Sequence, residues 1–125
     1  MAWTLDSGRP IYAQIIERVQ LDIITGRYKP GEKLPSVREL ASEAAVNPNT
    51  MQKALSELEQ SGLLYTQRTS GRFITEDTEL IHRIKNDLAT MQVREFIRKM
   101  RQIGLGDNEI LQLINTIMKE ETIDE

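Results

Sequence analysis

Five polar side chains near the middle of the chain form the pattern best suited to chemistry with another molecule. They are Asn49, Thr50, Gln52, Lys53 and Ser56. Amide side chains can donate and accept together at the edge of adenine, while threonine and lysine suit a base edge or a phosphate. The pattern therefore predicts contact with double-stranded DNA. On these residues alone, a plain solvated helix face remains an alternative.

A helix that begins at residue 48 is expected to position these side chains. Asn47 suits the N-cap and Pro48 the first helical position. Met51, Leu55 and Leu58 then recur at spacings of four and three residues. This spacing predicts that they form one buried face. The polar residues lie on the opposite, exposed face.

A shorter helix is expected just before this one. Ser36 and Glu39 have the spacing of a capping box, and the helix should run to about Ala44. Only a few residues then join the two helices, as a helix-turn-helix requires. Arg38, near the start of the shorter helix, suits a phosphate or a groove edge. A surface arginine without a partner explains it equally well.

Two strand-like runs follow, Leu63-Leu64-Tyr65 and Arg72-Phe73-Ile74. Polar residues and a glycine separate them, which predicts a β-hairpin with a longer loop. The expected tip consists of Arg68, Thr69, Ser70, Gly71 and Arg72. Its two guanidinium groups and flexible turn suit the minor groove or the sugar-phosphate backbone of DNA. An ordinary solvated turn is the alternative.

Helices are also expected on both sides of this region. The first begins at Pro10, carries apolar residues at helical spacing and ends at Gly26. Beyond Glu76, apolar residues again recur at helical spacing until Gly104 interrupts them. Asp107 is predicted to cap a last helix.

Together these elements predict a mainly α fold with one small β-hairpin, of the α+β class. Residues 1–75 are expected to form a winged helix-turn-helix DNA-binding domain, and residues 76–125 a two-helix dimerisation tail. Residues 1–75 hold 9 basic and 8 acidic residues, whereas residues 76–125 hold 7 and 11, which gives the net charge of −3. The acidic total does not exclude DNA binding, because only groups that reach phosphate contribute to it.

The tail is expected to form a dimer interface. Its apolar side chains lie around much of the helix circumference. Their combined surface is larger than one small neighbouring helix would cover. The predicted interface residues are Phe96, Ile97, Met100, Ile103, Ile110, Ile114 and Ile117. A dimer with two-fold symmetry would also match an operator made of two half-sites. Packing of the tail on the N-terminal domain is the alternative.

Other functions have little support in the composition. The chain has no cysteine, which excludes disulfides, thiolate metal sites and cysteine nucleophiles. His82 is its only histidine. The sequence shows no phosphate-binding glycine loop, nucleophile elbow or metal motif. We therefore expect no enzyme activity, cofactor or metal. Without a signal peptide or an apolar run long enough to span a membrane, the expected location is the cytoplasm.

Three segments resemble the winged helix-turn-helix of the GntR family of bacterial regulators: LPSVRELA (34–41), VNPNTMQKALSELEQSGLL (46–64) and YTQRTSGRFI (65–74). The opening GRPIYAQI (8–15), the tetrapeptide NPNT (47–50) and the short tail resemble the YtrA-like subgroup in particular. The resemblance covers nearly the whole chain. It is strong to about residue 75 and weaker beyond that point.

The resemblance implies a homodimeric repressor on a palindromic operator, dimerised through the tail. The implied DNA contacts fall on Arg38, Asn47, Asn49, Thr50, Gln52, Ser70 and Gly71. Pro48 stands where many relatives have an arginine, so base reading should shift to Asn49 and Gln52. Thr69 also stands where the wing often has a glycine.

Two questions stay open at this point. A two-helix tail cannot enclose a pocket like those of larger family members. If a small-molecule effector exists, we expect it in the crevice between the two domains or at the dimer interface. The alternative to an operator-binding regulator is a winged-helix protein-interaction module that does not bind DNA.

Overall fold

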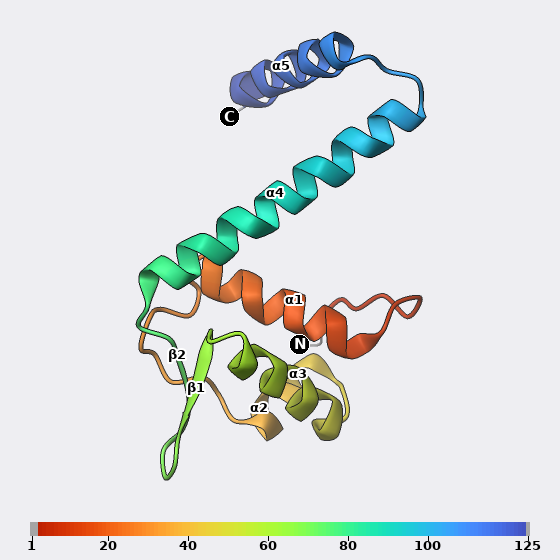
Figure 1. Cartoon of the computed structure of the whole chain (residues 1–125). Coiled ribbons are helices and arrows are strands. Elements are labelled where there is room, and N and C mark those ends of the chain that lie inside the picture. The colour runs from red at the N-terminus through yellow and green to blue at the C-terminus, as the bar shows by residue number, and fades with distance from the viewer. Residues whose placement is uncertain (1–2, 125) are drawn as a thin grey trace. The chain divides into compact units, whose positions relative to one another are not determined.

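The computed structural model describes residues 3–124, which divide into two compact units, one up to Lys85 and one from Asn86 onward. The elements follow in the order α1 (Ile11–Ile24), α2 (Val37–Ala44), α3 (Pro48–Gln60), β1 (Leu64–Gln67), β2 (Gly71–Ile74), α4 (Thr78–Gln102) and α5 (Asp107–Asp124) (Figure 1). The first unit contains α1 to β2 and the beginning of α4. The predicted mainly α fold with one hairpin is confirmed.

The helix-turn-helix consists of α2, a short turn and α3. The capping box of α2 is confirmed: Ser36 Oγ accepts a hydrogen bond from the Glu39 N–H at 3.1 Å, and Glu39 Oε1 accepts one from the Ser36 N–H at 3.4 Å. The turn begins at Ala45, whose φ of 60° and ψ of 47° are left-handed. That conformation costs a non-glycine residue roughly 1–2 kcal/mol. It ends α2 at once and keeps the connection to α3 short.

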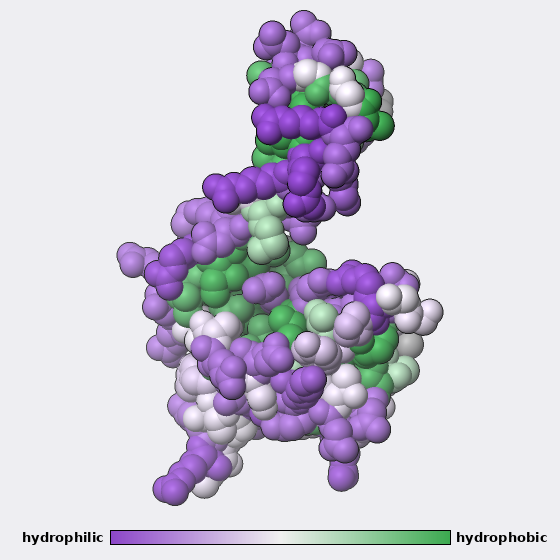
Figure 2. All heavy atoms as spheres, turned by 45° about the vertical axis from the view of Figure 1, so that its right-hand side comes forward, coloured by the Kyte–Doolittle hydropathy of each residue, from purple (hydrophilic) through white to green (hydrophobic). Residues whose placement is uncertain are grey.

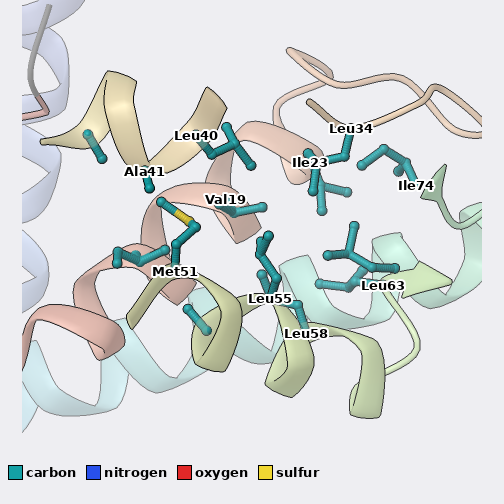
Figure 3. Packing of buried hydrophobic residues seen from close by; sticks show 14 of the residues in the cluster. Val19, Ile23, Leu34, Leu40, Ala41, Met51, Leu55, Leu58, Leu63 and Ile74 are labelled. Atoms are coloured by element: carbon teal, nitrogen blue, oxygen red, sulfur yellow. The ribbon is translucent and has the colours of Figure 1, made fainter. Parts of the chain in front are cut away.

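The core of the first unit is formed where α1, α2, α3 and the hairpin converge (Figure 3). Its fully or nearly fully buried members include Ile15, Val19, Ile23, Leu40, Met51, Leu55, Leu58, Leu63 and Ile74. The burial predicted for Met51, Leu55 and Leu58 is thus confirmed. Because one face of α3 is buried in this core, its opposite face must point outward.

The hairpin is a two-stranded antiparallel sheet in which Leu64 pairs with Ile74 and Gln67 with Gly71. The expected longer loop was wrong, because only residues 68–70 separate the strands. The polar residues after Tyr65 continue β1, and the Ser70 N–H donates to the Gln67 carbonyl at 3.1 Å to close the turn. Polar side chains suit a strand whose face is exposed, so the sequence resembled a loop.

The strand β2 is also bound to the segment that precedes α2. The Leu34 N–H donates to the Arg72 carbonyl at 2.9 Å, and the Ile74 N–H donates to the Glu32 carbonyl at 2.8 Å. These bonds give β2 backbone partners on both sides. They attach the hairpin directly to the lead-in of the helix-turn-helix.

The first turns of α4 belong to the first unit. Ile81 and Ile84 pack against its core, which extends the compact unit to Lys85. The division of the chain at residues 75 and 76 stays a prediction about functional domains. Within the described residues, no helix is both long and apolar enough to cross a membrane.

The second unit contains the rest of α4 and α5. The prediction that Asp107 caps the last helix was wrong. Gly106 is the cap, because its carbonyl accepts from the Ile110 N–H at 3.0 Å and its N–H donates to Glu109 Oε1 at 3.0 Å. The carboxylate of Asp107 instead pairs with Arg101 at 3.1 Å. The N–H groups at a helix start need hydrogen-bond acceptors, and here Glu109 supplies one to the Gly106 N–H.

Leu55→Ala should test how strongly α3 depends on this core. Leu55 has no exposed surface, so its truncation should lower the free energy of unfolding by about 2–5 kcal/mol, as measured by urea denaturation. The matched control is Leu21→Ala on α1, where the leucine is 47% exposed; it should cost less than about 1 kcal/mol. Equal losses in the two variants would contradict the assigned packing.

Candidate nucleic-acid interface

The outward face of α3 carries the polar residues that the sequence assigned to DNA contact. Asn49, Gln52 and Lys53 are exposed, and Thr50 is half-buried. All four lie near the start of α3, while Met51 between them is fully buried. The structure therefore places the four side chains together on one surface, opposite the core.

Asn47 lies at the start of the same surface and caps the helix. Its Oδ1 accepts a hydrogen bond from the Asn49 N–H at 2.7 Å, which confirms the predicted N-cap. The bond satisfies one of the donors that a helix leaves unpaired at its start. The side-chain carbonyl of Asn47 is thus engaged within the protein, and only its amide NH2 is left for another molecule.

Two of the other side chains on this face also have neighbours within the chain. The Gln52 Nε2 donates to Ser56 Oγ at 3.4 Å. The Lys53 Nζ lies 4.0 Å from the centre of the Tyr12 ring, close enough for a cation–π interaction. Tyr12 comes from α1, far away in sequence, so no local spacing could have shown that it orients Lys53.

The wing, residues 64–74, projects from the first unit beside α3 (Figure 1). Arg68 and Ser70 are exposed in its turn, and Gly71 begins β2 with a φ of 104° that favours glycine. Figure 2 shows hydrophilic atoms around the wing tip. The turn can therefore present its backbone and Arg68 to a polar partner.

Arg72 lies in β2 rather than in the turn, and it has a partner within the protein. Its Nε donates to the Glu59 carboxylate near the end of α3, and the Arg72 side chain is only 17% exposed. The sequence did not single out Glu59. A single acidic residue near a helix end has no spacing that would relate it to a later strand.

The wing and the start of α2 border the same groove. An open groove of about 610 Å³ lies between the start of α2 and the wing, with Lys33, Ser36, Ser70 and Gly71 among its lining residues. Arg38 is exposed on α2, two residues beyond Ser36. The predicted contacts on α2, α3 and the wing thus lie on adjoining elements of a single unit.

Two ionisable groups in the first unit have shifted pKa values. Burial favours the neutral form of Glu59, but hydrogen bonds from Arg72 and Thr66, together with the charge of Arg72, outweigh it and lower its pKa below 4.5. Burial raises the pKa of Tyr28 above 10.0, and nearby carboxylates, Asp22 first among them, raise it further. Glu59 therefore stays ionised beside the wing at neutral pH.

An exposed polar helix, seated on a core by its apolar face and flanked by a β-hairpin, defines a DNA-binding winged helix-turn-helix regulator. Comparison with known proteins agrees with this class. The profile for bacterial regulatory proteins of the gntR family matches residues 11–74. The chain belongs to the GntR family.

Two relatives from Bacillus subtilis show which members of the family the chain is similar to. It is 39% identical to the HTH-type transcriptional regulator YhcF over 110 residues, which cover 88% of this chain and 91% of YhcF. It is 48% identical to the transcriptional repressor YtrA over 73 residues, which cover 58% of this chain and 56% of YtrA. The similarity to YhcF therefore includes the tail as well as the winged domain.

Solved structures agree with these relationships. A GntR family transcriptional regulator from Listeria monocytogenes is 39% identical, with a TM-score of 0.85 over 90% of this chain and 98% of its own. The DNA-binding domain of AraR in complex with operator ORE1 is 32% identical, with a TM-score of 0.52 over 60% of this chain and 94% of its own. The second similarity relates the first unit to a domain solved on its operator.

Glu59→Gln should change how stability depends on pH. Because the folded-state pKa of Glu59 is lowered, its ionised form adds stability above pH 4.5 that is lost as the pH falls through the folded-state pKa. Wild type should unfold in urea with a larger free energy than Glu59→Gln at pH 7, and the difference should shrink below about pH 4.5. The control Glu57→Gln changes an exposed residue of the same helix. Its free energy of unfolding at pH 7 should differ less from that of wild type. A Glu59→Gln difference that stays constant or grows on acidification would contradict the assignment.

Proposed function

We propose that the protein is a repressor that binds a palindromic operator as a homodimer and has no catalytic activity. The observation that carries the proposal is the outward polar face of α3, held by the core beside an exposed wing. YtrA, which shares 48% identity over the matched region, is a transcriptional repressor, and this supports repression here. Because bacterial DNA lies in the cytoplasm, the proposal places the protein there.

The proposed contacts divide by element. On α3, Asn49 and Gln52 carry exposed amides suited to adenine edges in the major groove, with Thr50 beside them. Lys53, held over Tyr12, suits a phosphate. Asn47 keeps one amide donor for the same surface.

The remaining proposed contacts flank the recognition helix. Arg38 on α2 is an exposed guanidinium suited to a phosphate or a groove edge. In the wing, Arg68 and Ser70 are exposed, and the backbone at Gly71 is open to a close approach. Arg72, the second guanidinium that the sequence assigned to the wing tip, is partly covered and ion-paired with Glu59.

The tail supports the homodimer in the proposal. Figure 2 shows apolar atoms on its surface, and within the predicted interface Phe96 is 40%, Ile103 67% and Ile117 46% exposed. Isolated chains rarely expose so many large apolar side chains in so short a segment. A second copy of the tail would cover them, and two-fold symmetry would place two recognition helices on paired half-sites.

The other residues of the predicted interface are less accessible. Ile97, Met100 and Ile114 are half-buried, and Ile110 is only 4% exposed. Ile110 therefore contributes to packing within the chain. Further exposed apolar residues of the tail extend the proposed interface: Met91, Val93, Leu111, Leu113 and Met118. A small-molecule effector stays a prediction.

Operator binding should be salt-dependent and should depend on Arg38 and Asn49. A duplex selected by the protein from a random-sequence library provides the probe for fluorescence anisotropy across a salt series. Arg38→Ala should weaken binding and lower the salt slope by about one, because it removes one phosphate contact. Asn49→Ala should cost about 1–3 kcal/mol of discrimination against the wrong base.

Arg27→Ala is the matched control for Arg38→Ala, since Arg27 is exposed but lies outside the helix-turn-helix and the wing. Its affinity should stay close to that of wild type. If the library yields no enriched sequence, or if binding is insensitive to salt, the operator-binding proposal is wrong and a protein-interaction module takes its place.

Ile117→Asp should dissociate the proposed dimer. Burying an unpaired carboxylate at an apolar interface is strongly unfavourable, so sedimentation equilibrium should show a monomer at concentrations where wild type is dimeric. Asn115→Asp introduces the same charge at an exposed polar position of α5 and is the control. A wild type that is monomeric at all concentrations, or an Ile117→Asp dimer as tight as wild type, would contradict the assigned interface.

A further inference from the structure

One carboxylate of the recognition helix holds both strands of the wing. Glu59, in the last turn of α3, accepts a hydrogen bond on Oε1 from Thr66 Oγ1 at 2.8 Å, and the same oxygen accepts one from Arg72 Nε. Thr66 lies in β1 and Arg72 in β2, and the two residues are direct partners across the hairpin. A single oxygen atom therefore links α3 to both strands.

We propose that Glu59 is a positioning residue that fixes the direction of the wing relative to the recognition helix, with Arg72 as its counterpart rather than a DNA ligand. This inference rests on the proposed operator binding. It assigns to Arg72 a role that differs from the direct contact predicted from the sequence. Arg68, exposed in the turn, is then the guanidinium that the wing offers to DNA.

The hydrogen bonds to Glu59 lie close to the turn of the hairpin, so they can restrain its tip. Only the Gln67–Gly71 pair lies between the Thr66–Arg72 pair and the three-residue turn. The backbone bonds from the segment before α2 hold β2 at Arg72 and Ile74, but they do not hold β1. β1 is held by its pairing with β2, and Glu59 adds a side-chain connection from α3 to β1 through Thr66, close to the turn.

The surroundings of the link distinguish it from an ordinary surface ion pair. The Glu59 and Arg72 side chains are 29% and 17% exposed, whereas Arg9 and Glu17, which also form an ion pair, are 48% and 54% exposed. Exposed pairs contribute little because water and salt screen them. A mostly covered pair with a second hydrogen bond on the same oxygen holds its geometry more firmly.

The first test compares Glu59→Ala with Glu57→Ala on the library-selected duplex. Both variants remove one negative charge from the same helix and introduce the same helix-favouring residue, but Glu57 is exposed and lies outside the link. Glu59→Ala should bind about tenfold more weakly than Glu57→Ala, the effect expected when charged hydrogen bonds are lost. Hydroxyl-radical footprinting should show that the protection made by the wing is lost while that made by α3 remains.

The footprint separates positioning from a purely structural role. If Glu59→Ala is less stable but, below its melting temperature, binds as tightly as Glu57→Ala with the wing footprint intact, the inference is overturned. Should Glu59→Ala not fold, Thr66→Val provides the measurement, since it removes only the hydroxyl donor and should weaken the wing footprint by a smaller amount. If wild type itself enriches no duplex, the operator-binding proposal has failed and not this inference alone.

The second test asks whether Arg72 touches DNA. Arg68→Ala should lower the salt slope of binding by about one, as the loss of a phosphate contact does. Arg72→Ala should weaken binding with the salt slope unchanged. A slope that falls by about one in Arg72→Ala would show a direct phosphate contact and would overturn the assigned role.

Discussion

The burial of one face of α3 against α1 is the constraint on which the rest of the structure depends. Met51, Leu55 and Leu58 have almost no exposed surface, and they meet Ile15 and Val19 in the same core. Because the helix is fixed along this face, its rotation about its own axis is fixed too, and the polar face can point only outward. Base recognition needs side chains held in one orientation, and the core supplies that orientation without contacting DNA itself.

Short-range hydrogen bonds then set where the remaining parts of the interface lie. The capping box at Ser36 and the left-handed turn at Ala45 set where α2 begins and ends. Asn47, three residues after Ala44, caps the start of α3. The wing is attached by backbone bonds to the segment before α2 and by Glu59 to α3. The packed core thus fixes the recognition helix and the buried base of the wing at Leu64 and Ile74, whereas polar bonds hold the exposed outer part of the hairpin.

Local sequence signals predicted most of the fold and the helical part of the candidate interface. Caps and apolar spacing act within a few residues, so Ser36, Asn47 and the buried face of α3 could be assigned from the sequence. The polar strand residue Thr66 resembled a loop, and Gly106 rather than Asp107 caps α5. The partners of Arg72 and Lys53 come from other helices, Glu59 on α3 and Tyr12 on α1. Contacts of that kind depend on tertiary packing, so single-sequence patterns do not show them.

The most direct test of the central claim, that the outward face of α3 and the wing together form the DNA-binding surface, is an amide chemical-shift titration of the labelled protein with its library-selected duplex. The account predicts the largest shifts in residues 36–38, 47–53 and 68–71, and small shifts at Leu21 and Arg27 of the same unit. Shifts confined to the tail, or spread evenly over α1 and the wing, would contradict it.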